Sequence, residues 1–411
     1  MKKAITSVLL LSLVTAGLTA FRSSDPVAPD PSRYLYVWAG TSDHSAGHDK
    51  PGISMVAVFD VDPSSKSYGS LITAVTVDSA AGMPHHTEFS PPANATSFFA
   101  NDFGADKSYV IDFSTPTKPR IAGRTPAVPG SRMMHSFARL PNGNVLATMQ
   151  FGDKKTEGDP GALAEFDRDG RLLRSTSSAD KAFPGAKIRT YGLTVAPAID
   201  RAVTTSSPMN DEATAHVVQV WRLSTLELLK TVPVPELPAD SSHRYPFELR
   251  TMADGKTVFL NSYMCGFYRL TNLETSPTIE RLMSVPGVGC SVPYVAGKIM
   301  VMPIAYAHRI LSFDISNPAK PVELASLQTD TTFFPHWTSG DPSSNRIVMT
   351  DQGDGIPRIM IGALDPATGR ITIDEKFRDP GSDKPGINFA NVSWPNGVKG
   401  KVTPHGALFI Q

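Results

Sequence analysis

Five of the ten histidines in this 411-residue chain follow a turn and stand at the beginning of a short segment with strand-like composition. These five are His85, His86, His135, His336 and His405. Imidazole is the commonest side-chain metal ligand, because its neutral ring has a nitrogen lone pair available near pH 7. Three or four imidazoles in a partly buried site suit copper, zinc, iron or nickel better than calcium or magnesium. The question is therefore which fold brings these distant residues together.

A repeated pattern indicates how the chain is divided. Residues 111–119, IDFSTPTKP, match residues 313–321, FDISNPAKP, and the aligned aspartates Asp112 and Asp314 are 202 positions apart. That separation corresponds to four units of about 50 residues, a length typical of propeller repeats. Short runs rich in Val, Ile, Phe, Tyr and Thr alternate with Gly, Pro, Asn and Asp, and no run shows sustained helical periodicity. The sequence predicts an all-β chain of many short strands.

Seven of these runs are expected to be the innermost strands of propeller blades. They begin near His85, His135, Tyr191, Phe247, Ser291, His336 and His405. Most intervals span about 45 to 56 residues, which suits a blade of four strands, and residues 379–401 lengthen the last interval with a Pro/Gly-rich loop. The run at 405–410 lacks strands after it, and N-terminal runs near 34–38, 55–59 and 71–77 can supply them. We predict one seven-bladed β-propeller domain over 34–411, closed by pairing of its N- and C-terminal strands, with six or eight blades as alternatives.

The predicted blades place most histidines on one face of the ring. The start of each innermost strand and the connection between the second and third strands open on the same face. His44, His48 and His308 fall in such connections, His243 precedes an innermost strand, and only His216 lies elsewhere. The metal ligands that we predict are the histidines at the innermost strands: His85, His86, His135, His405 and His336.

The histidine pair and the nearby Glu88 have more than one interpretation. Successive side chains of a regular strand point to opposite faces, so His85 and His86 both turn inward only if the strand start is irregular. Otherwise one of the pair binds metal and the other packs or forms hydrogen bonds. Glu88 could orient an imidazole or be a surface charge.

The two cysteines, Cys265 and Cys290, are expected on this same face in neighbouring blades. A disulfide is possible between them if the protein is exported to an oxidising compartment. Thiolate ligation of copper is the alternative.

The N-terminus indicates export. Lys2 and Lys3 precede an apolar run at 4–18 and a small residue at Ala20, as in a secretory signal peptide over 1–20, with an uncleaved anchor as the alternative. A flexible lead-in follows at 21–33, and we expect a periplasmic or secreted protein with no further membrane contact. The 39 basic and 39 acidic residues give a net charge of +0 without a basic cluster, which argues against a nucleic-acid partner.

The histidine pair at 85–86, His135 fifty residues later, the Asp-x-Ser-x-Pro units and His405 near the C-terminus resemble the selenium-binding protein / methanethiol oxidase family. This resemblance implies a seven-bladed propeller and a periplasmic copper enzyme that oxidises methanethiol. It also implies that His85, His86, His135 and His405 are copper ligands and that His336 occupies a position where histidine is frequent. The family's histidine pair precedes a cysteine-rich segment, whereas Thr87 to Ser90 contain no cysteine, so the chain resembles a divergent branch.

Three functions are consistent with these features. The first is a copper-dependent oxidoreductase acting on a small molecule, for which a thiol such as methanethiol is the candidate, with zinc or another transition metal as the alternative ion. The second is a non-catalytic propeller that binds a partner protein or ligand, since a fold alone does not determine function. The third is a propeller-type lactonase or hydrolase using a hard cation, which requires converging oxygen ligands where this chain has mainly histidine.

Overall fold

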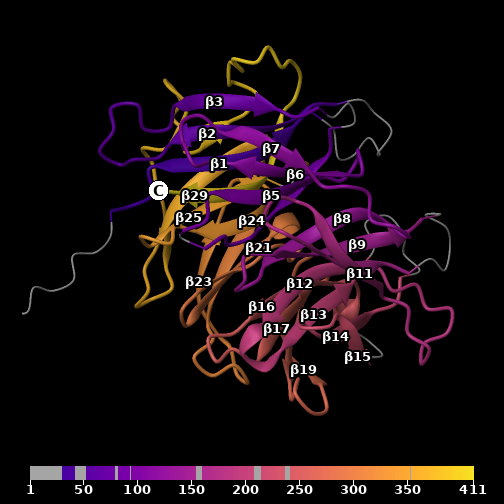
Figure 1. Cartoon of the computed structure of the whole chain (residues 1–411). Helices are drawn as coiled ribbons and strands as arrows, with labels where there is room; N and C mark the ends of the chain where they lie inside the picture. The colour runs from indigo at the N-terminus through magenta and orange to yellow at the C-terminus, as the bar shows by residue number, and fades with distance from the viewer. Residues whose placement is uncertain are drawn as a thin grey trace, which may run out of the picture.

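The computed structural model of the chain describes residues 30–41, 52–78, 82–92, 94–153, 160–207, 214–236, 241–351 and 353–411. These residues form seven antiparallel sheets arranged as the blades of a β-propeller (Figure 1), which confirms the predicted fold. The described residues contain no α-helix, only the 3-10 turns η2 (Pro197–Ile199), η3 (Ser241–His243) and η4 (Ala305–Ala307). No helix long and apolar enough to cross a membrane occurs in the described ranges.

The first four blades follow the chain from the N-terminus, and the last strand of the chain joins blade 1. Blade 1 contains β29 (Thr403–Ile410), β1 (Tyr34–Gly40), β2 (Ser54–Asp60) and β3 (Leu71–Thr76). Blade 2 contains β4 (Pro84–Thr87), β5 (Ser97–Asp102), β6 (Lys107–Asp112) and β7 (Arg120–Arg124). Blade 3 contains β8 (Ser131–Arg139), β9 (Val145–Gly152), β10 (Ala162–Phe166) and β11 (Leu172–Ser177). Blade 4 contains β12 (Thr190–Ala196), β13 (Arg201–Ser206), β14 (Val217–Arg222) and β15 (Glu227–Pro233).

The other three blades complete the ring. Blade 5 contains β16 (Pro246–Thr251), β17 (Val258–Ser262), β18 (Gly266–Thr271) and β19 (Thr278–Ser284). Blade 6 contains β20 (Tyr294–Ala296), β21 (Ile299–Ile304), β22 (Arg309–Asp314) and β23 (Val322–Gln328). Blade 7 contains β24 (Pro335–Gly340), β25 (Arg346–Asp351), β26 (Arg358–Leu364) and β27 (Ile371–Ile373), and the short β28 (Ile387–Asn388) pairs with β26.

Burial explains why the strands differ in sequence pattern. The interior strands β2, β9 and β13 are buried at every residue, because both faces of a blade pack against neighbouring blades. Such strands are continuous apolar runs rather than alternating ones. The outermost strands β7 and β11 alternate between partly buried and exposed residues. Full burial of each large apolar side chain contributes about 1.5–3 kcal/mol, so the faces between blades supply most of the stability.

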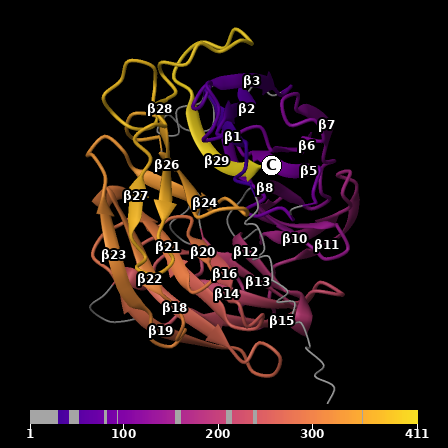
Figure 2. The same ribbon diagram turned by 90° about the vertical axis from the view of Figure 1, so that its left-hand side faces the viewer.

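The two ends of the chain close the ring in blade 1. β1 pairs with β2 on one side and with β29 on the other, so that Tyr36 lies opposite Leu408. Figure 2 shows the yellow β29 beside the indigo β1. A closed ring leaves no open edge between the first and last blades.

A hydrogen-bonded network fixes the chain just before β1. The Ser32 backbone N–H donates to Asp341 Oδ2 at 3.1 Å, and the Ser32 hydroxyl donates to Asp341 Oδ1 at 2.7 Å. Arg346 Nη2 also donates to Asp341 Oδ2 at 2.8 Å. The end of the predicted flexible lead-in is therefore held in place at Ser32. The predicted signal peptide and residues 21–29 lie outside the described residues.

Replacing Asp341 by asparagine is expected to lower the free energy of unfolding at pH 7 by about 3 kcal/mol, because Arg346 loses its buried charge partner. Burial raises the pKa of the Asp341 carboxyl, but hydrogen bonds from Ser344 and Ser32 outweigh it, so the pKa lies below its ordinary value of 3.8. A depressed pKa stabilises the fold above pH 3.8, and this contribution is lost as the pH falls through the folded-state pKa. Urea unfolding of both proteins from pH 7 to pH 3 should show their difference shrinking only at the acid end. A difference that does not depend on pH would contradict this account.

Candidate metal centre

The innermost strands that carry the candidate histidines share one irregularity. In blade 2, Pro84 pairs with Asp102 and Thr87 pairs with Ala100, so His85 and His86 stand opposite one residue. This two-against-one arrangement is a β-bulge, which bends the strand and redirects its side chains. The resulting geometry places the two imidazoles side by side, with ring centroids 4.6 Å apart and 27° between their planes. The bulge is the irregularity at the strand start that both rings need in order to turn inward.

The same irregularity occurs at the other three histidines. In blade 3, the register shift between Met134 and Phe137 falls at His135. In blade 1 the shift between β1 and β29 falls at His405, and in blade 7 the shift in β24 falls at His336. Bulges are frequent next to functional sites because they aim side chains away from the regular pleat. The irregular inner strands of blades 1, 2, 3 and 7 therefore redirect the five histidines toward the centre of the ring.

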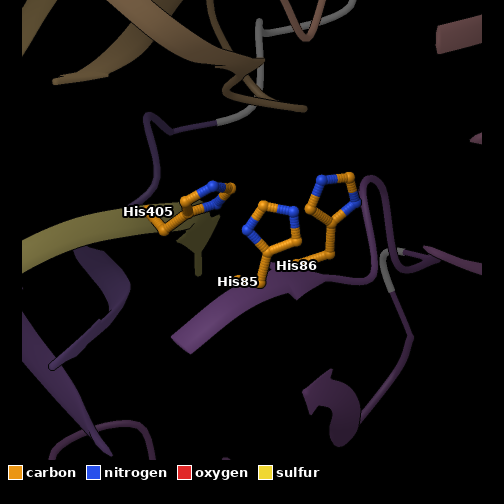
Figure 3. Close-up of side chains that lie close together, drawn as sticks. All are labelled: His85, His86 and His405. Carbon is orange, nitrogen blue, oxygen red and sulfur yellow. The ribbon is translucent and has the colours of Figure 1, made fainter. Parts of the chain in front are cut away.

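The five histidines meet in one buried cluster, which we call the channel cluster: His85, His86, His135, His336 and His405. Each of the five is at most 5 % exposed. Nε2 of His85 lies 2.9 Å from Nε2 of His135, and the Nε2 atoms of His336 and His405 are 3.1 Å apart. Figure 3 shows His405 on the yellow β29 facing His85 and His86 on the purple β4. The ring centroids of His85 and His405 are 4.2 Å apart.

Two details of the chain hold the rings in these positions. A Cβ on Gly406 would lie 2.8 Å from the Thr87 hydroxyl, so glycine permits the close approach of β29 to β4. The Ser136 hydroxyl lies 3.0 Å from Nδ1 of His135 and 3.2 Å from Nδ1 of His86. A hydroxyl donates one hydrogen bond and accepts others, so Ser136 fixes both rings through Nδ1. Partners of this kind orient imidazole ligands so that the other nitrogen faces the metal.

Burial keeps these imidazoles neutral. Desolvation, with a smaller contribution from His336, lowers the pKa of His135 to about 3, although a hydrogen bond with the Tyr191 backbone opposes this shift. Desolvation, followed by the nearby His135, His405 and His336, also holds the pKa of His86 well below 6.5. At neutral pH each of these two rings therefore has one nitrogen with a free lone pair, the form that binds metals.

The donor set fits a transition-metal ion. One ring nitrogen from each of His85, His86 and His405 lies within 4.8 Å of the other two. Two nitrogens bound to one tetrahedral ion at 2.0–2.1 Å are about 3.3 Å apart, close to the Nε2 separations of the two histidine pairs. Nε2 of His86 is buried and has no hydrogen-bond partner in the part of the chain that the structure describes. Such an atom is costly unless a ligand satisfies it.

Aromatic side chains surround the cluster on several sides. The Tyr191 ring lies 3.7 Å from the His135 ring, and the Trp337 ring lies 5.3 Å from the His86 ring. Phe103 lies 5.8 Å from His85. Phe334 contacts His308 in an edge-to-face arrangement, with ring centroids 4.4 Å apart. The site therefore combines several nitrogens that could bind a metal with apolar neighbours, a combination typical of small-molecule sites.

His216 and His308 lie outside the channel cluster. His44 and His48 lie outside the described residues. His308 ends η4, and its Nδ1 lies 3.0 Å from the Phe333 carbonyl oxygen. His216 directly precedes β14, the third strand of blade 4, so the prediction that it lies away from the second-to-third connections was wrong. Counting the strands of blade 4 from Tyr191 would have given its position.

Glu88 neither touches an imidazole nor lies at the surface. It is 1 % exposed, accepts a hydrogen bond from the Phe99 N–H at 2.9 Å, and pairs with Arg139. Arg139 Nε donates to Glu88 Oε2 at 2.9 Å. Burial raises the pKa of Glu88, and Arg139 opposes this shift. Glu88 thus joins β4 of blade 2 to β8 of blade 3 and holds the segment after the histidine pair.

A disulfide joins Cys265 and Cys290, whose Cα atoms are 5.1 Å apart. It connects blade 5, just before β18, to the chain that leads into β20 of blade 6. Both cysteines are fully buried against Phe267 and Met302. They lie in a different core cluster from the histidine-bearing strands, and their thiols are used in the disulfide.

Comparison with known proteins extends the description of the fold. No family model and no curated protein matches the chain. The structure of a hypothetical selenium-binding protein from Sulfolobus tokodaii is similar, with TM-score 0.71 and 14% identity over 92% of this chain and 93% of that one. The periplasmic gluconolactonase of Pseudomonas aeruginosa has TM-score 0.58 and 14% identity over 82% and 94%. The Cps50 propeller domain of Myceliophteria thermophila has TM-score 0.54 and 11% identity over 79% and 93%.

These similarities show a common fold, and the proteins that share it have different names and chemistries. At this level of identity the fold does not determine the function, which must be argued from the site. The chain is a seven-bladed β-propeller with five buried histidines at the centre of its ring. By its fold the chain therefore belongs to the class of seven-bladed β-propellers.

Proposed function

We propose that the channel cluster binds copper and that the protein is an exported copper-dependent oxidoreductase acting on a small molecule, with methanethiol as the first candidate. The observation that carries this proposal is the convergence of five buried imidazoles from four blades. Imidazole suits copper, zinc, iron and nickel, and copper forms the most stable complexes in that series. The thiol substrate comes from the resemblance of the histidine pattern to the selenium-binding protein / methanethiol oxidase family. The fold is similar to that of a hypothetical selenium-binding protein, and the similarity to a gluconolactonase gives equal support to a lactonase.

His85, His86, His135 and His405 would hold the ion, with His336 beside His405. Copper, when bound, supplies one-electron redox chemistry, and the protein supplies orientation and surroundings. Ser136 keeps the His86 and His135 rings oriented through their Nδ1 atoms. The low pKa of His135 keeps that ring unprotonated, so protons do not compete for it at neutral pH.

The proposed reaction balances without a further cofactor. Methanethiol, dioxygen and water would give formaldehyde, hydrogen sulfide and hydrogen peroxide, so the carbon is oxidised and dioxygen is reduced by two electrons. Tyr191, Trp337 and Phe103 would form apolar walls that exclude water and accept a small uncharged thiol. The raised pKa of Tyr191, caused first by burial, keeps its phenol protonated.

An oxygen electrode tests this proposal. We expect copper-loaded protein to consume dioxygen when methanethiol is added and to release formaldehyde, sulfide and peroxide in equal amounts. Glucono-lactones and 6-phosphogluconolactone serve as competing substrates in a parallel hydrolysis assay. Lactone hydrolysis without oxygen uptake would replace the oxidase by the lactonase alternative. The absence of both activities in metal-loaded protein would favour the non-catalytic binding propeller.

A further inference from the structure

A second histidine group lies between blades 4 and 5, away from the channel cluster. It consists of His216 before β14, Glu236 after β15 and His243 at the end of η3, which leads into β16. Strands of a blade alternate in direction, so these three chain positions meet on the same face of the ring. One ligand atom from each residue lies within 4.8 Å of the other two. Three separate segments of the chain therefore converge on one point.

The three side chains lie close together, and one ring nitrogen of His216 lacks a hydrogen-bond partner among the described residues. The ring centroids of His216 and His243 are 5.5 Å apart, and His243 Nε2 lies 3.9 Å from Glu236 Oε1. The His216 carbonyl accepts a hydrogen bond from the Val234 N–H at 2.9 Å, which fixes His216 beside the chain that leads to Glu236. His216 Nε2 is buried and has no hydrogen-bond partner among the described residues. A buried ring nitrogen in this state is stabilised by any ligand that reaches it.

The donors determine the kind of ligand. Two imidazoles and one carboxylate bind borderline divalent ions such as zinc, and sites with three protein ligands keep an open fourth position. Calcium would require six or more oxygen ligands, which this group does not provide. Ligand atoms on a tetrahedral zinc ion are about 3.3 Å apart. His243 Nε2 and Glu236 Oε1 are 3.9 Å apart in the structure, so the donor atoms must move closer together to bind the ion. The Glu236 side chain is 71% exposed and is free to make this movement.

We propose that His216, Glu236 and His243 form a second metal site, which binds a divalent transition metal of the zinc type and ties the connection between β15 and β16 to the start of β14. The site is open to solvent through Glu236, so its fourth position takes water or a small anionic ligand. This inference does not depend on copper in the channel cluster, because the two groups share no residue.

Calorimetric titration of the full exported chain with Zn²⁺ tests this site. We expect wild-type protein to bind one more zinc ion than the His216→Ala variant. Glu236→Gln should weaken that ion at least about tenfold, because an amide oxygen is a poorer ligand than a carboxylate. Glu323→Gln, which changes an exposed glutamate on β23, is the matched control and should bind like wild type. Zinc should raise the melting temperature of wild-type protein more than that of His216→Ala.

The channel cluster provides the second control. His135→Ala should retain the zinc ion at His216, Glu236 and His243, because that change lies in blade 3. Identical zinc number and affinity in wild type, His216→Ala and Glu236→Gln would overturn the proposal. Loss of the additional zinc only in His135→Ala would also overturn it. If His216→Ala fails to fold, Glu236→Gln alone decides the question, since its exposed side chain is not needed for packing.

Discussion

Replacing His135 by alanine is expected to weaken copper binding at the channel cluster by at least about 100-fold, since even partners outside the ligand shell typically contribute 10–100-fold. His135 is fully buried, its Nε2 faces Nε2 of His85, and its Nδ1 contacts Ser136. The change removes a predicted ligand and one of the two rings that Ser136 orients. The measurement is copper affinity by competition with a chromophoric chelator.

The fold is expected to survive this substitution. The lost packing against Tyr191 lowers the free energy of unfolding by about 2–4 kcal/mol, a value typical of buried large-to-small changes. His308→Asn is the matched control, because His308 lies outside the cluster at φ 48°, a backbone conformation that asparagine tolerates. Unchanged copper affinity in well-folded His135→Ala would contradict the assignment of this histidine as a ligand.

Replacing Glu88 by alanine is expected to lower the free energy of unfolding by about 3–5 kcal/mol. The side chains of Glu88 and Arg139 are 2% and 9% exposed, so the substitution leaves the guanidinium buried without its charge partner. The Phe99 N–H also loses its acceptor. Urea unfolding at pH 7, followed by tryptophan fluorescence and circular dichroism, measures the loss.

The double variant Glu88→Met with Arg139→Met separates the charge effect from packing. Removing both charges avoids an unpaired buried ion, so we expect this variant to be more stable than Glu88→Ala. A Glu88→Ala protein as stable as wild type would show that the pair contributes nothing to the packing of blades 2 and 3. The exposed pair Arg222 and Glu227 provides a comparison, because its removal is expected to cost no more than about 1 kcal/mol.

The blade architecture could be predicted from the sequence because each blade repeats the same local signals. Apolar runs bounded by Gly, Pro, Asn and Asp predicted the strands, and the lack of strand-like runs after 405–410 indicated that the ring closes with the N-terminal strands. The starts predicted near Tyr191, Phe247 and His336 agree with β12, β16 and β24. Ser291 precedes β20 by three residues, a displacement typical of strand boundaries.

The details of the site depend on features that a single sequence does not display. The bulges that turn His85 and His86 to the same side arise from pairing with β5, so they require the partner strand. Glu88 and Arg139 are 51 residues apart, and only the packing of adjacent blades brings them together. The position of His216 was missed because the strands of blade 4 were not counted individually.

Elemental mass spectrometry of the exported chain, isolated without added metal or a histidine tag, tests the central claim most directly. The account predicts close to one copper ion per wild-type chain and strong depletion in His86→Ala, because His86 Nε2 is a buried nitrogen without a hydrogen-bond partner among the described residues. Copper should persist in His216→Ala, since that residue belongs to the second group. Protein that contains no copper as isolated and binds none after copper loading would contradict the account.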